Sequence, residues 1–392
     1  MAPLHHILTS LLLGSISLAA ALPANITTSA VNLDGSFVND IAKCPRLTKR
    51  TSVPTNVTDV RPDDLKVVLA LGDSITAAFA AKGHQITKPF ELLDEHRGLS
   101  FAMGGDQGTV SLANFFKAYA PQVKGASTGK HLVTVCYGGL CNGLKYYPED
   151  GFNVAQSGAM VENLDAELDL LITQVKANKN VDIQNDWKFL NLLIGANDMC
   201  QACPGSLTGD KYEQSMRAIV EKLRANFPRL IVHIQTIFKV SQVWDVTKDI
   251  PYCKTIRAFG LSMVCPCGFL GGDTFIGVGG RQMMDNAADT WNARLMKIAA
   301  DYKGKYNDFA VIVDPATGGT PVPDGLPLQK SFGQDFISNI DCFHPSVNAH
   351  QFIAKSVWNN LYLPSDKKAT SYDTKRETSI YCPTEADRIQ VL

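Results

Sequence analysis

The chain has 392 residues, of which 45% are hydrophobic and 19% are charged. This is the composition of an ordinary globular protein, and it excludes a disordered or fibrous chain. The 37 Lys and Arg residues nearly balance the 38 Asp and Glu residues, so there is no basic footprint and we expect no nucleic-acid partner. The length leaves room for one large domain or two.

Residues 1–21 predict a secretory signal peptide. They contain no Asp, Glu, Lys or Arg, and the small residues Ala19 and Ala21 predict cleavage after Ala21. An uncleaved membrane anchor is the alternative, although the apolar run Ile7–Ala21 is shorter than the ~20 residues that a bilayer span requires. No later stretch could span a membrane, and the C-terminal residues lack a hydrophobic GPI tail. We therefore expect a soluble, extracellular protein.

Two sequons, at Asn25 and Asn56, fit passage through a glycosylating secretory pathway. In that compartment the ten cysteines are expected to form disulfides, whose pairing the sequence leaves open. The candidates are Cys44, Cys136, Cys141, Cys200, Cys203, Cys253, Cys265, Cys267, Cys342 and Cys382.

Two other roles for the cysteines fit less well. A zinc site at Cys200 and Cys203 needs a second ligand pair, and Cys265 and Cys267 are spaced too closely for a usual zinc knuckle. A thioredoxin-like redox role is disfavoured because Cys200 and Cys203 follow an Asn-Asp turn. Disulfides are therefore the preferred interpretation.

The regular pattern begins after a polar segment. Residues 22–62 are rich in Thr, Asn, Asp and Pro and lack a sustained period, which predicts an extended N-terminal arm tied to the body through Cys44. Residues 63–365 carry the pattern of one domain, and residues 366–392 follow as a C-terminal tail.

Within the domain, short apolar runs alternate with amphipathic periods. The runs predict buried strands at Val67–Leu71, Leu190–Ile194, Leu230–Ile237 and Phe309–Val313. Helical periods occupy residues 164–175, 212–223 and 288–302. This alternation predicts a three-layer α/β/α sandwich around a mainly parallel sheet.

The Gly-rich stretch Cys253–Arg281 interrupts the pattern and predicts a bridged surface insertion. Its apolar side chains either pack beneath the insertion or form a rim that faces lipid. They are Leu261, Met263, Val264, Phe269 and Leu270.

Ser74 is the candidate nucleophile. It follows a predicted strand within Gly72-Asp73-Ser74, where Gly72 permits a tight turn and a helix can begin. Ligands of open parallel sheets bind beyond the carboxyl ends of the strands, so a hydroxyl at this point is well placed to react. The same three residues also make an ordinary turn, and the assignment needs a base.

His344 is the best-placed base. Asp341 precedes it by three residues, and Pro345 and Ser346 can start a helix, so the carboxylate and the imidazole project from one turn. Asp341 can then hold the neutral tautomer and stabilise the imidazolium. By contrast, His233 is interpreted as a satisfied histidine beside the core, and His350 as a solvated or capping one.

An oxyanion formed on an ester needs donors that already point at it. The Asn197 side chain, in a Gly-containing turn after the second predicted strand, is one candidate, and its alternative role is an Asx turn. Gly158 ends a short strand-like piece, and its N–H is a second candidate donor. The N–H of Ser74 is the third.

Four short blocks occur in order along the chain, at Ser74, Gly158, Asn197 and Asp341–His344. Together they resemble the SGNH, or GDSL-type, serine hydrolases, and they resemble the phospholipase B branch most closely. The similarity covers about residues 52–362. The stretches that carry it are Arg61–Val68, Arg97–Ser100, Gly104–Asp106, Asn197–Cys200 and Asp341–Pro345.

The resemblance implies a flavodoxin-like fold, a Ser74–His344–Asp341 triad, an oxyanion hole from Ser74, Gly158 and Asn197, and ester hydrolysis without metal or other cofactor. Ile75 stands where the family motif has Leu, which is a conservative change. Animal members of the branch carry tandem repeats and a membrane tail, whereas this chain has one unit and no recognisable anchor.

The leading hypothesis is a secreted serine esterase that removes acyl chains from phospholipids or lysophospholipids through an acyl-enzyme on Ser74. We expect a monomer that touches a membrane or micelle surface transiently. An esterase for acetylated polysaccharides or short-chain esters is the alternative, and acyl transfer would use the same intermediate. A catalytically silent secreted binding protein is the alternative from another class.

Overall fold

The computed structural model describes residues 33–83, 93–201, 203, 207–258, 260, 264–315, 334–369 and 379–392. The expected signal peptide, Asn25, Leu261 and Met263 lie outside these residues.

A parallel sheet forms the centre of the described chain. Its strands are β2 (Leu65–Gly72), β5 (Trp187–Leu193), β6 (Leu230–Gln235) and β7 (Phe309–Asp314), hydrogen-bonded in the order β2-β5-β6-β7. The strands are almost entirely buried, which explains why their sequences read as continuous apolar runs. All four predicted strands are confirmed.

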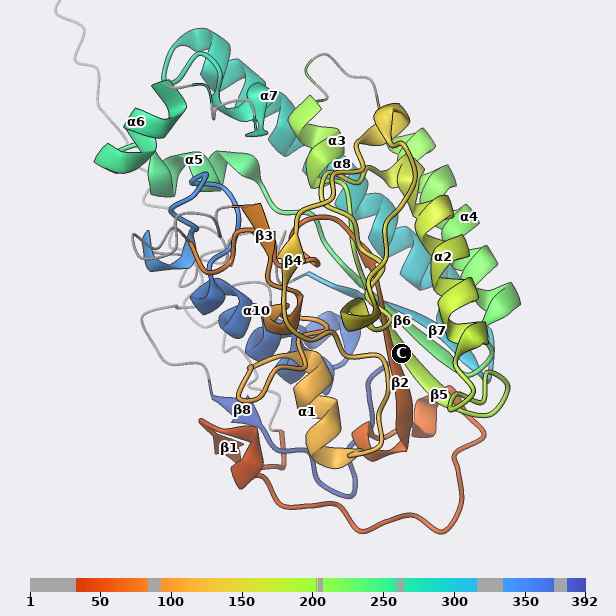
Figure 1. Ribbon diagram of the computed structural model, residues 1–392. Coiled ribbons are helices and arrows are strands. Elements are labelled where there is room, and N and C mark those ends of the chain that lie inside the picture. The colour runs from red at the N-terminus through yellow and green to blue at the C-terminus, as the bar shows by residue number, and fades with distance from the viewer. Residues whose placement is uncertain are drawn as a thin grey trace, which may run out of the picture. The chain divides into compact units, whose positions relative to one another are not determined.

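Helices cover both faces of the sheet (Figure 1). On one side lie α2 (Leu164–Ala177), α4 (Gly209–Asn226) and α8 (Phe275–Tyr302), and on the other lie α1 (Leu112–Tyr119) and α10 (Val347–Asn360). The three predicted amphipathic segments correspond to α2, α4 and the second half of α8. The predicted three-layer α/β/α sandwich is therefore confirmed.

A further parallel segment extends the sheet beyond β2. The β2 residue Ala70 donates to the carbonyl of Phe152 and accepts from the N–H of Val154. Residues 152–156 therefore run along the free edge of β2, which agrees with the predicted strand-like piece and carries it toward Gly158.

The predicted insertion is helical. It contains α6 (Pro251–Ala258), α7 (Pro266–Phe269) and the start of α8, which begins at Phe275 despite the nearby glycines. Gly277 is buried, and a Cβ atom there would collide with the carbonyl of Gly272. The glycine thus allows the first turn of α8 to pack closely against the preceding turn.

The remaining strands and α-helices of the described residues are short. They are β1 (Phe37–Val38), β3 (Asp94–Glu95), β4 (His131–Leu132), α3 (Ala196–Gln201), α5 (Val240–Thr247) and β8 (Ile380–Tyr381). Strand β1 pairs antiparallel with β8, and β3 pairs with β4. No described helix combines the length and apolar composition needed to cross a membrane.

The described part of the expected arm is held at more points than Cys44. The Trp187 indole donates to the carbonyl of Pro54, and the N–H of Ile389 donates to the carbonyl of Val60. Ile389 is itself buried, so residues from both predicted flanking segments contribute to packing around the sheet.

Candidate active site

Ser74 lies two residues beyond β2, at the carboxyl edge of the sheet. Gly72 has a φ of 148°, and a Cβ atom there would lie 2.5 Å from the carbonyl oxygen of Leu193 on the neighbouring strand. Only glycine tolerates this combination of angle and contact. The Asp73 carboxylate accepts from the N–H of Ile75 at 2.9 Å and holds the turn that carries Ser74.

The three predicted catalytic side chains form one hydrogen-bonded chain. His344 Nε2 lies 2.8 Å from Ser74 Oγ, and His344 Nδ1 lies 2.5 Å from Asp341 Oδ2. Asp341 Oδ1 also accepts from the N–H groups of Phe343 and His344, each at 3.0 Å. All three side chains are buried.

The charge state of Asp341 suits an orienting role. Burial would raise its pKa, but the His344 side chain and the two backbone donors hold the pKa below its ordinary value. Asp341 therefore stays ionised and accepts from His344 Nδ1, which leaves Nε2 facing Ser74 as the basic nitrogen.

The loop that carries Asp341 and His344 is conformationally constrained. Cys342, which lies between them, has a φ of 55°, a left-handed conformation that is uncommon outside glycine. Its side chain is bonded to Cys253 in α6. A cross-link to the helical insertion thus anchors the turn that carries Asp341 and His344.

The structure brings the three candidate oxyanion donors into neighbouring segments. The Asn197 amide donates to the carbonyl of Ala159 at 2.9 Å, which ties α3 to the residue after Gly158 and leaves its second N–H available. No described residue accepts from the backbone N–H of Ser74 or of Gly158. Within the described part of the chain, both N–H groups therefore remain available to a further acceptor.

Gly158 is required by its conformation and its neighbours. Its φ is 84°, and an added Cβ would lie 3.0 Å from Val135 and 3.2 Å from the carbonyl of Cys136. Cys136 in turn donates its N–H to the carbonyl of Ser157 and is bonded to Cys141. The loop closed by the Cys136–Cys141 disulfide therefore packs directly against the Gly158 turn.

A buried ion pair supports the same segment from another side. Arg97 donates to Glu95 Oε2 and also to the carbonyls of Asn153 and Ala155. The Ser157 hydroxyl lies 2.5 Å from Glu95 Oε1. The guanidinium and the carboxylate together hold the backbone that leads to Gly158. Glu95 was not predicted, because its contact to this segment is made through Ser157, 62 residues away in the sequence.

Two carboxyl groups in the segments that carry Ser74 and Asn197 are buried. Burial raises the pKa of Asp73 to about 6 and that of Asp198 to about 7. Asp198 accepts from the N–H of Val161, which adds a second tie between α3 and the segment after Gly158. Perturbed carboxyl groups of this kind are common near functional sites.

All ten cysteines, each within the described residues, are paired. The disulfides are Cys44–Cys382, Cys136–Cys141, Cys200–Cys265, Cys203–Cys267 and Cys253–Cys342. Cys200 and Cys203 bond to different partners rather than to each other, so the structure forms no thioredoxin-like bridge. The part of the chain that the structure describes has no group of three or more His, Cys, Asp or Glu side chains arranged to hold a metal ion.

His233 and His350 are the other two histidines for which the sequence predicted a role. His233 lies 3.1 Å from the Asn191 side chain and 3.4 Å from Asp314, as expected of a satisfied core histidine. The expectation of a solvated or capping His350 was wrong. The ring of His350 is fully buried, and its Nδ1 accepts from the N–H of Phe101, because His350 lies on the buried face of α10.

Comparison with known proteins gives a family match and several relatives. Residues 68–357 match the family model of the GDSL-like lipase/acylhydrolases. The human protein "Phospholipase B1, membrane-associated" is 28% identical over 364 residues, with 88% of this chain and 22% of the human protein covered. Its rat counterpart is 30% identical over 355 residues, with 87% and 22% covered. The chain thus spans about a fifth of the length of these relatives.

Among solved structures, an acetyl xylan esterase from Geobacillus stearothermophilus aligns with a TM-score of 0.35 and 14% identity, covering 79% of this chain and 98% of the esterase. A lipase from Streptomyces rimosus aligns with a TM-score of 0.33 and 15% identity, covering 73% and 94%. The family model spans most of the sequence, and this chain belongs to the GDSL-like lipase/acylhydrolase family of ester hydrolases.

Proposed function

We propose that this protein hydrolyses acyl esters of phospholipids or lysophospholipids through an acyl-enzyme on Ser74. The observation that carries the proposal is the chain of contacts from Ser74 Oγ to His344 Nε2, 2.8 Å, and from His344 Nδ1 to Asp341, 2.5 Å. Similarity to phospholipase B1 over most of the chain supports the lipid substrate.

The proposed reaction has two halves. Ser74 Oγ attacks the ester carbonyl carbon while His344 Nε2 takes the hydroxyl proton, and Asp341 stabilises the resulting imidazolium. The N–H groups of Ser74 and Gly158 and the Asn197 amide donate to the oxyanion. When the C–O bond breaks, His344 returns the proton to the leaving alkoxide, and water then cleaves the acyl-enzyme by the same steps.

An apolar surface near α3 supports a lipid substrate. We define the apolar tip as Leu270, Phe275, Ile276 and Val278, at the junction of α7 and α8. Phe275 is 87% exposed and Ile276 is 61% exposed, and no charged residue occurs from Thr274 to Gly280. Leaving such side chains in water is unfavourable and is typical of a docking surface.

The apolar tip borders a groove of about 280 Å³. Its lining includes Cys200 and Gln201 of α3, and Leu270 and Ile276 from the tip. Cys200 and Gln201 follow Asn197 by three and four residues, so they share a face of α3 with the proposed oxyanion donor. We propose that acyl chains of a lipid aggregate occupy this groove and the tip.

The remaining elements of the proposal concern location. The five disulfides are compatible with an oxidising, extracellular compartment. Asn56 caps a short helical turn, and its side-chain oxygen accepts from Thr58. We propose that the protein is secreted as a monomer and that Asn56 carries a glycan.

Replacement of the nucleophile tests the reaction. We expect Ser74→Ala to abolish both labelling by a fluorophosphonate and hydrolysis of every ester, because no acyl-enzyme can form. The assay is a panel of phospholipid, lysophospholipid, p-nitrophenyl and acetylated-sugar substrates. Labelling that persists in the variant would exclude Ser74, and activity on acetylated sugars alone would exclude the lipid substrate.

The apolar tip provides the test of lipid contact. In the double variant Phe275→Ser/Ile276→Ser we expect hydrolysis of phosphatidylcholine vesicles to fall ~10-fold or more, since both side chains contribute apolar area to docking. Hydrolysis of a soluble p-nitrophenyl ester should not change. The matched control is Met296→Ser, an exposed apolar residue ~30 Å further along α8. Equal vesicle activity in both variants would contradict the proposal.

A further inference from the structure

Helix α2 carries a charged residue on its buried face. Leu164, Leu168, Leu171 and Ile172 form this face, and Glu167 belongs to it by spacing, three residues after Leu164 and four before Leu171. The Glu167 side chain is fully buried. Burying a carboxylate is costly unless hydrogen bonds compensate, so its partners indicate its purpose.

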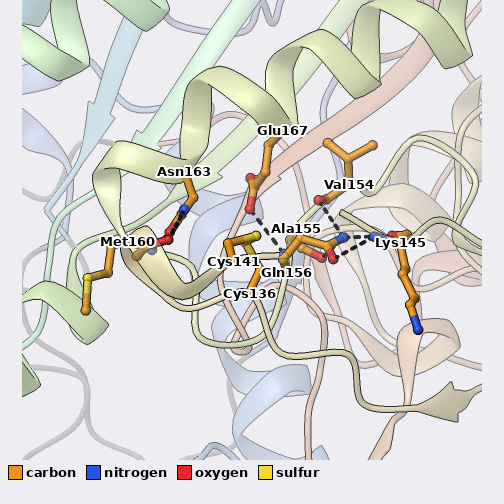
Figure 2. The surroundings of a disulfide bond; sticks show 10 residues. Cys136, Cys141, Lys145, Val154, Ala155, Gln156, Met160, Asn163 and Glu167 are labelled. Atoms are coloured by element: carbon orange, nitrogen blue, oxygen red, sulfur yellow. Dashed lines mark hydrogen bonds between the residues drawn. A yellow bond between two sulfur atoms is a disulfide. The ribbon is translucent and has the colours of Figure 1, made fainter. Parts of the chain in front are cut away.

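The Glu167 carboxylate joins the two segments that carry the backbone oxyanion donors. Oε2 accepts from the N–H of Gly72 at 2.9 Å, and Oε1 accepts from the N–H of Gln156 at 3.2 Å. Gly72 lies two residues before Ser74, and Gln156 lies two residues before Gly158. Figure 2 shows Glu167 reaching down from α2 to Gln156, beside the Cys136–Cys141 disulfide.

The two segments also contact each other at this point. The N–H of Gln156 is shared between Glu167 and the carbonyl of Gly72, 3.1 Å away. Gly72, Gln156 and Glu167 therefore form a closed ring of hydrogen bonds. The Gln156 side chain is fixed as well, because its amide donates to the carbonyls of Lys145 and Val154 (Figure 2).

The electrostatic surroundings do not explain why a carboxylate is retained here. Burial raises the pKa of Glu167 well above its ordinary value, and the nearby Asp73 carboxyl raises the pKa further. The Arg97 guanidinium acts in the opposite direction but does not bond to Glu167. A leucine at this position would continue the apolar face, so the two backbone bonds are the distinctive contribution of the glutamate.

We propose that Glu167 is a positioning residue that sets the separation between the N–H groups of Ser74 and Gly158. This inference rests on the proposed function, in which both groups donate to the oxyanion. Glu167 touches no substrate. It acts by accepting from the N–H groups of Gly72 and Gln156, each of which lies two residues before one of the two donors.

The test compares Glu167→Gln with Leu168→Ala. Glutamine keeps one acceptor oxygen but turns an NH₂ group toward the other backbone donor, so one of the two bonds is lost. Leu168 is the next residue of α2 and is fully buried, and its side chain has no acceptor for those N–H groups, so its truncation controls for lost stability. Both variants are assayed well below their unfolding temperatures on a soluble p-nitrophenyl ester.

For Glu167→Gln we expect kcat to fall ~10- to 100-fold with little change in KM, since misplaced donors weaken only the transition state. Affinity for an alkyl boronic acid, whose adduct with Ser74 places an oxygen at the oxyanion site, should fall by a similar factor. Leu168→Ala should keep wild-type kcat and boronate affinity. A Glu167→Gln enzyme with kcat within threefold of wild type would overturn the inference.

These outcomes are separable from failure of the proposed function. If the wild-type protein hydrolyses no ester, or if Ser74→Ala stays active, the function itself is wrong. If Glu167→Gln does not fold, hydrogen–deuterium exchange of the intact wild-type protein decides. The inference requires strong protection of the Gly72 and Gln156 amides, and exchange at the rate of an exposed loop at either position would refute it.

Discussion

Asp73 lies directly before the proposed nucleophile Ser74, and its carboxyl group is buried. One oxygen accepts from the N–H of Ile75, whereas Oδ2 has no hydrogen-bond partner among the described residues. Because burial raises its pKa to about 6, the folded protein binds a proton here more tightly than the unfolded chain does. This carboxyl therefore favours the folded state most below pH ~4, and that contribution is lost as the pH rises through about 6.

We predict that Asp73→Asn removes this pH dependence, because asparagine is neutral throughout. As the pH rises from 4.5 to 7.5, the unfolding free energy of the variant should increase by roughly 1–3 kcal/mol relative to that of the wild type. The measurement is urea denaturation of both proteins at the two pH values. The readout is the difference in unfolding free energy between the two proteins at each pH. This difference is needed because burial lowers the pKa of His350 to about 3, so His350 makes both proteins more stable as the pH rises. Parallel pH curves would contradict this prediction.

At the scale of elements, the sheet was predictable because a strand buried on both faces has a continuous apolar sequence. Strand β2 is an example, since seven of its eight residues are buried. The start of α8 was not predictable, because its glycines contradict helical propensity. They are tolerated where Gly277 packs against the backbone of Gly272, a contact that exists only in the folded chain.

The site was predictable only where its residues are close in sequence. Asp341 and His344 share one turn, and their spacing anticipated the observed contact. Glu167 is recognisable in the sequence as a charged residue on the apolar face of an amphipathic helix. That pattern does not identify its partners, Gly72 and Gln156. Pairing of the cysteines was likewise open, because pairing depends on tertiary contacts that no spacing specifies.

At the scale of the whole molecule, disulfides hold together loops that are far apart in sequence. Cys253–Cys342 links the insertion to the turn between Asp341 and His344 and closes a sequence separation of 89 residues. Cys44–Cys382 closes a separation of 338 residues beside the β1–β8 pair. In the chain-entropy model both bridges stabilise the fold by a similar amount, roughly 4–6 kcal/mol. Of these two bridges, only Cys253–Cys342 lies in the turn that carries Asp341 and His344.

We therefore predict that the paired variants Cys253→Ser/Cys342→Ser and Cys44→Ser/Cys382→Ser lose similar stability but differ in activity. Without its cross-link, the turn at Cys342 can relax from its left-handed conformation and move His344 away from Ser74. We expect kcat on a soluble ester to fall ~10-fold or more in the first variant and to stay at the wild-type level in the second. Circular dichroism at the assay temperature must show both folded. Equal kcat in the two variants would mean that the bridges serve the fold alone.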